Sequence, residues 1–134
     1  MRPFDAVALY LIGKIRYNRR LYMKRTSIGE FEEIVLLITA LLEEDAYGVT
    51  ITQEIEKQTG RKVGFNTVHT TLQRLEEKGL ISSKMGGATT ERGGRRKRYF
   101  RITALGSRTL RELKELREKL WKVLPTKVIG LSQN

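Results

Sequence analysis

The chain has 134 residues and a formal net charge of +11, and 40% of its residues are hydrophobic, which predicts one compact domain with a small core. The lack of cysteine excludes disulfides and thiolate metal sites, and fits a reducing cytoplasm. With His69 as the single histidine and no phosphate-binding loop, we expect no enzyme, metal or cofactor, and no apolar run reaches the ~18 residues of a membrane span.

The segment 1–22 mixes apolar and basic residues without capping or turn signals. We interpret it as an N-terminal extension that is mobile or not part of the native chain, because structured patterning begins at Met23. The alternative is a basic amphipathic helix that docks on a membrane or on a partner.

Two helices are predicted next. Ser27 and Glu30 have the spacing of a capping box, with Ser27 as the N-cap, and the helix that follows contains the apolar run 34–42, which predicts a central position. The second helix covers about 49–59, with Val49, Ile51 and Ile55 facing inward and Gly60 as its stop.

A third helix is predicted over 66–78, and Gly79 ends it. Steps of 100° per residue place four side chains on its inner face, namely Val68, Thr71, Leu72 and Leu75. Strands are predicted over 80–85 and 96–102, joined by the glycine-rich loop 86–94. Thr103 then caps a last helix that Pro125 ends.

This order predicts a mainly α fold with a small β-hairpin, a winged helix-turn-helix followed by a long C-terminal dimerisation helix. The expected divisions are the extension 1–22, a DNA-binding domain 23–103, a dimerisation helix 104–124 and a flexible tail 125–134.

In a helix-turn-helix the second helix of the motif lies in the major groove, with its N-terminal residues at base edges. The candidates in the helix 66–78 are Asn66, Thr67, His69, Thr70, Gln73 and Arg74. Asparagine and glutamine can pair with adenine, and threonine offers a hydroxyl and a methyl group. Alternatively, Asn66 only caps the helix, the threonines are solvated, and His69 is half-buried between helices.

Tyr47, at the start of the second helix, has two interpretations of equal weight. Its hydroxyl could donate to a DNA phosphate, or its ring could belong to the core.

The charge is concentrated on the hairpin. Residues 26–83 carry five basic and ten acidic side chains, whereas residues 84–101 carry seven basic and one acidic. We expect phosphate contacts from Arg92, Arg95, Arg96 and Lys97, with a merely solubilising charge run as the alternative. Alternation along the second strand places Phe100 and Ile102 on the core side and Tyr99 and Arg101 on the outer face. Arg98 shares the parity of Phe100, so it is expected to pair within the protein instead.

The last helix carries an apolar stripe that a single winged-helix core cannot cover. We therefore predict a homodimer through Leu110, Leu113, Leu116, Leu120, Trp121 and Leu124. Trp121 is the expected interface anchor. The alternative is a helix that folds back on its own core.

Four segments, IGEFEEIVLLITALL, EDAYGVTITQEIEKQTG, TVHTTLQRLEEKGLI and ERGGRRKRYFRIT, together resemble the PadR family of bacterial transcriptional regulators, in particular its short members with a single C-terminal helix. The likeness covers about residues 23–124. It implies a dimeric repressor of operator DNA that a small aromatic or lipophilic effector releases, and dimerisation would suit a palindromic operator. Asn66 and His69 depart from the family pattern, which favours a small residue and a tyrosine there, and the segment 1–22 has no counterpart. The alternative function is a winged-helix module that binds a protein or a membrane without specific DNA binding.

Overall fold

The computed structural model describes residues 27–86 and 96–130. Its elements are α2 (Glu30–Leu42), a 3₁₀ turn (Glu43–Asp45), α3 (Gly48–Thr59), α4 (Phe65–Glu77), β1 (Ile81–Met85), β2 (Arg98–Ile102) and α5 (Ala104–Val123). The predicted order of three helices, a hairpin and a long last helix is confirmed. The extension 1–22 lies outside the described residues.

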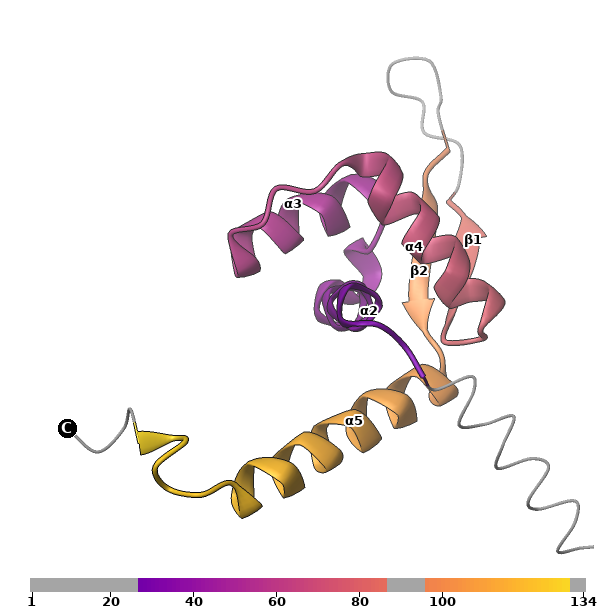
Figure 1. The fold of residues 1–134 in the computed structure, drawn as a ribbon. Coiled ribbons are helices and arrows are strands. Elements are labelled where there is room, and N and C mark those ends of the chain that lie inside the picture. Colours follow the sequence, from indigo (N-terminus) through magenta and orange to yellow (C-terminus); the bar gives the residue numbers. More distant parts are fainter. Residues whose placement is uncertain (1–26, 87–95, 131–134) are drawn as a thin grey trace, which may run out of the picture.

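Helix α2 lies at the centre of the molecule, with α3 and α4 on one side of it, the hairpin beside it and α5 across its other side (Figure 1). The capping box predicted at Ser27 and Glu30 is wrong. Gly29 is the N-cap, and its N–H donates to Oε1 of Glu32 at 3.3 Å. The glutamate that serves the cap is thus the one three residues after Gly29, so the helix starts later than the serine suggested.

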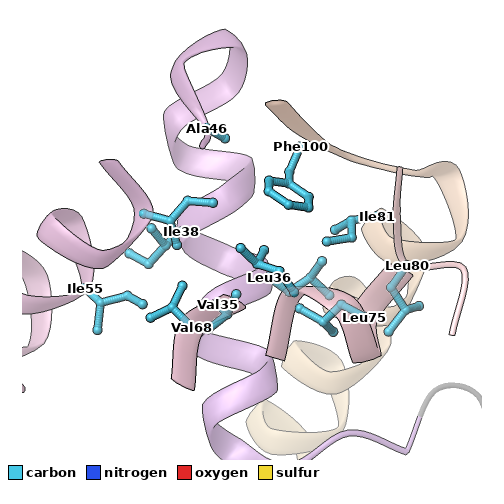
Figure 2. Close-up of a cluster of buried hydrophobic side chains, with 12 residues drawn as sticks. Val35, Leu36, Ile38, Ala46, Ile55, Val68, Leu75, Leu80, Ile81 and Phe100 are labelled. Atoms are coloured by element: carbon cyan, nitrogen blue, oxygen red, sulfur yellow. The ribbon is translucent and has the colours of Figure 1, made fainter. Parts of the chain in front are cut away.

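Within the described ranges, the core is formed by twelve buried hydrophobic side chains that come from α2, α3, α4, the hairpin and the segments next to them, and Figure 2 shows them converging. The predicted inner faces of α3 and α4 are confirmed for Ile51 and Ile55 and for the four residues of α4. Val49 was wrongly placed inward, because it is 48% exposed. It lies two residues before Ile51, and a 200° rotation puts the two on opposite sides of a helix.

The hairpin is antiparallel, and Ile81 pairs with Ile102 at its open end. Phe100 is buried in the core, as its parity predicted. A short third segment, not foreseen from the sequence, pairs with the other edge of β2. There the N–H of Phe100 donates to the carbonyl of Ala46 at 2.8 Å, and Tyr47 forms a bridge with Tyr99. This segment is too short to show strand alternation, but it ties the start of α3 to the wing.

Helix α5 begins at the predicted cap. The hydroxyl of Thr103 accepts the N–H of Gly106 at 3.0 Å and donates to the carbonyl of Gly79 at 2.7 Å. From there α5 crosses α2 and runs away from the hairpin (Figure 1). It ends at Val123, just before Pro125, as predicted. The segment after it forms a turn in which the N–H of Val128 donates to the carbonyl of Pro125, and residues 131–134 are not described.

Glu43, at the end of α2, is the one non-glycine residue with positive φ in the described part of the chain, at φ 51° and ψ −113°. A side chain with a Cβ is strained in this conformation, and glycine is not. We expect Glu43→Gly to raise the free energy of unfolding by about 1 kcal/mol in urea titrations. Glu44→Gly, the neighbouring control, has no such strain to relieve and should not stabilise the chain; equal effects of the two changes would contradict the prediction.

Candidate nucleic-acid interface

Three parts of the fold meet on one side of the molecule: the first turn of α3, the first turn of α4 and the base of the hairpin. The ring of Tyr47 meets that of Tyr99 edge to face at 5.5 Å and 70°. Nζ of Lys97 lies 4.4 Å from the centroid of the Tyr47 ring and donates to the Tyr47 hydroxyl at 3.3 Å. We call Tyr47, Lys97 and Tyr99 the tyrosine–lysine cluster; it joins α3 to the wing.

This cluster decides between the two interpretations of Tyr47 only in part. Its ring is half-buried rather than enclosed in the core, and it packs on the wing. Its hydroxyl oxygen accepts from Lys97, so the hydroxyl hydrogen remains available to another acceptor. Tyr99 was predicted on the outer face of the strand, and no local pattern indicated its contact with Tyr47.

Two of the four predicted wing residues are described. Arg96 and Lys97 are exposed, whereas Arg92 and Arg95 lie outside the described residues. The N–H of Gly86 donates to the carbonyl of Lys97 at 2.7 Å and continues the hairpin beyond its strands. The backbone at Lys97 is therefore held in place.

Arg98 differs from these residues, as its parity predicted. Its guanidinium donates to the hydroxyl of Ser83 at 2.9 Å, and that hydroxyl donates to the carboxylate of Glu76 on α4. Arg98 thus links the hairpin to the helix within the protein.

All six predicted side chains of α4 are exposed, namely Asn66, Thr67, His69, Thr70, Gln73 and Arg74. The Thr70 hydroxyl donates to the carbonyl of Asn66 at 2.9 Å, so toward a ligand it can offer an acceptor and a methyl group. Asn66 is not the cap, because α4 starts at Phe65 with Gly64 as N-cap.

His69 is exposed, so the alternative of a half-buried histidine is wrong. Its ring stacks on that of Phe65, with 6.1 Å between centroids and 8° between planes. Phe65 is 48% exposed at the first position of α4. The predicted helix 66–78 began one residue too late and left Phe65 outside it; an apolar residue directly after a glycine N-cap was the available signal.

Two ion pairs attach the connection between α3 and α4, and the C-terminal end of α4, to the acidic first turn of α2. Arg61, shortly before α4, pairs with Glu30, and Lys78, at its C-cap, pairs with Glu32 at 2.7 Å. The hydrogen bond from Arg61, together with its charge, lowers the pKa of Glu30. Of the two pairs, the one at Lys78 is the less exposed and joins the C-cap of α4 directly to α2.

A second surface lies on α5. Leu110 and Leu113 are half-buried and border a groove with Leu37 of α2, whereas the rest of the stripe is exposed: Leu116 53%, Leu120 54%, Trp121 58% and Leu124 37%. On α2, Leu37 and Leu41 are also half exposed or more, at 50% and 56%, so this central helix is not covered all round. The alternative in which the whole stripe folds back on its own core is therefore wrong beyond Leu113.

An ion pair crosses between α2 and this helix. Arg117 Nη1 lies 2.6 Å from Oε1 of Glu33, whose side chain is only 7% exposed. It holds α5 against α2 about four turns from Thr103.

Other kinds of site find no support in the described residues. No group of three or more histidine, aspartate or glutamate side chains gathers there as a metal site would require. No helix in those ranges is both long and apolar enough to cross a membrane.

Comparison with known proteins agrees with this geometry. The family model described as "Transcriptional regulator PadR-like family" matches residues 37–112. "Uncharacterized protein X" of Lysinibacillus sphaericus is 39% identical over 87 residues, which are 63% of this chain and 75% of that protein.

Solved structures extend the comparison. A PadR-like transcription factor from Bacteroides fragilis is 26% identical, with 83% of this chain and 99% of that chain covered and a TM-score of 0.54. A PadR-like transcriptional regulator from Bacillus cereus is 24% identical over 78% and 92% of the two chains, with a TM-score of 0.59, and it supports the fold.

Proposed function

The chain belongs to the PadR-like family of transcriptional regulators, and on this premise we propose that it binds a palindromic operator in double-stranded DNA as a homodimer and represses transcription. The observation that carries the proposal is the convergence of the first turns of α3 and α4 with the base of the wing. Helix N-termini carry partial positive charge and free N–H groups, so two of them beside Arg96 and Lys97 suit a phosphate backbone.

In the proposed complex α4 enters the major groove. Gln73 and Asn66 would pair with bases, while Thr67 and Thr70 would offer acceptors and methyl groups. His69 and Arg74 would lie at the flanks of this face. The ion pair of Lys78 with Glu32 would help hold the C-terminal end of α4 against α2.

The wing and the tyrosine–lysine cluster would hold the backbone. Lys97 can reach a phosphate while its ammonium group remains beside the Tyr47 hydroxyl, which is free to donate to the same phosphate. Arg92 and Arg95, next to Arg96 along the sequence, would add two more charges.

The exposed stripe of α5 would pair with the same stripe of a second copy, with Trp121 as its anchor. A small aromatic or lipophilic effector would bind against this apolar surface, where Leu113, Leu116 and Leu120 lie, and would release the DNA by changing how the two copies pack.

Replacing Arg96 and Lys97 together with alanine tests the wing. We expect affinity to fall by about 10- to 100-fold for all DNA sequences alike, because phosphate contacts carry no sequence information. Two lost contacts per protomer make four per dimer, so the slope of log affinity against log salt should become shallower by about 3 to 4. Fluorescence anisotropy of labelled DNA across a salt series measures both quantities.

The matched control is Lys119→Ala/Lys122→Ala, which removes the same charge from exposed positions of α5. It should leave the slope almost unchanged. If the two variants lose affinity and slope equally, general charge and not the wing holds the DNA.

The proposed function as a whole is tested by selecting bound DNA from a random pool. We expect an inverted repeat to be enriched, with half-sites about one helical turn apart. Enrichment of no sequence, together with binding to a protein or lipid partner that survives the wing change, would favour the interaction module instead.

A further inference from the structure

Phe65 differs in chemistry from the rest of the exposed face of α4. The other exposed side chains of that face are polar, whereas Phe65 is a large hydrocarbon ring that is 48% exposed. It is the first residue of the helix, and the N-terminal residues of a recognition helix are those that reach base edges.

The ring is held from two sides. On one side it packs on Gly48 of α3 so closely that a Cβ at Gly48 would stand 2.6 Å from Cε2 of Phe65. On the other it stacks on His69. The exposed part of the ring is therefore a preorganised surface, which binds a partner at a lower cost in entropy than a mobile side chain.

The chemistry of the major groove identifies the chemical group that the Phe65 ring would contact. Base edges there carry hydrogen-bond donors and acceptors, which a benzene ring cannot satisfy, and one apolar group, the C5-methyl of thymine. We propose that Phe65, positioned by Gly48 and His69, contacts the methyl group of a thymine in each half-site and makes the operator preference of this chain depend on it. This inference rests on the proposed function, because it requires α4 to lie in the major groove.

Uracil provides the test, because it pairs as thymine does and lacks only the methyl group. In DNA selected by the wild-type chain, each thymine is replaced in turn by deoxyuridine, and affinity is measured by anisotropy. We expect one position per half-site at which wild type loses about fourfold per site, the value of one buried methyl-sized group. Phe65→Ala should bind the thymine and uracil forms of that site equally well.

Two further variants isolate the ring. Val49→Ala removes an apolar side chain of the same 48% exposure from α3, and it should keep the uracil loss of wild type. Gly48→Ala retains Phe65 but forces its ring to move, so it should lose uracil discrimination. Thermal melts followed by circular dichroism verify that each variant is folded at the assay temperature.

The outcomes separate the inference from its premise. If Phe65→Ala keeps the full uracil loss at every position, or if wild type shows none, the inference is overturned while the DNA-binding function stands. If wild type enriches no DNA at all, the proposed function fails and the inference fails with it.

Discussion

Replacing Gly106 with alanine is expected to lower the free energy of unfolding by about 3 kcal/mol, although the same change in an ordinary helix would raise it by about 1 kcal/mol. Gly106 lies in the first turn of α5 and is buried. A Cβ there would overlap the carbonyl oxygen of Leu80 and stand 2.8 Å from Cγ1 of Ile102. The sign of the effect therefore reports whether α5 contacts the backbone before β1 directly.

Relieving this clash costs free energy, because the overlapping atom is a backbone carbonyl oxygen that already accepts a hydrogen bond. The carbonyl of Leu80 accepts the N–H of Thr103 at 3.0 Å, and Leu80 itself is fully buried. Moving it would pull on the cap of α5 and on the core together. Alternative relief by shifting α5 would disturb the Thr103 hydrogen bonds that start the helix.

Urea denaturation of Gly106→Ala, with Ser107→Ala as control, measures the effect. Ser107 is the exposed next residue of the same turn, so its change improves helix propensity without meeting other atoms, and it should stabilise by a few tenths of a kcal/mol. Equal stabilisation by the two changes would mean that α5 stands further from the hairpin.

The sequence predicted the order of elements well, because that order depends on local signals. Three of these signals lie within a few residues of the structure that they specify. They are the 3.6-residue period of α4, Gly60 with its φ of 74°, and the Thr103 cap. The wrong or missing predictions concern places where the local signals were ambiguous or absent. Ser27 and Gly29 both precede a suitable glutamate, and only packing of α2 selects between them. The pairing of Ala46 and Tyr47 with β2 leaves no local pattern at all.

The candidate site also has some features that could be predicted from the sequence and others that could not. Exposure of the polar residues of α4 followed from its period, and the structural link of Arg98 followed from strand parity. The stack of Phe65 on His69 and the position of Lys97 over Tyr47 could not be predicted, because each joins side chains through the tertiary fold. A single aromatic residue forms no periodic pattern, so the sequence does not show whether its ring faces the core or a ligand.

Breaking the apolar stripe of α5 should have the largest effect on DNA binding. We expect Leu116→Ser/Leu120→Ser to leave the winged-helix domain folded, since both side chains are more than half exposed and contribute little to its core. In a two-fold dimer each change occurs twice, so four apolar contacts would be lost and the dimer dissociation constant should rise by about 1,000-fold or more. Analytical ultracentrifugation measures this change directly.

Loss of the dimer should then lower affinity for a full operator by about 100- to 10,000-fold, because the second half-site is no longer bound by a tethered partner. Affinity for an isolated half-site should remain close to that of wild type, since α4 and the wing are unchanged. The control Glu115→Ser/Lys122→Ser places two serines on the opposite face of α5 and keeps the net charge, so it should retain both the dimer and operator binding. A leucine variant that stays dimeric would place the interface elsewhere, and a monomer with undiminished operator affinity would show that each copy reads its DNA alone.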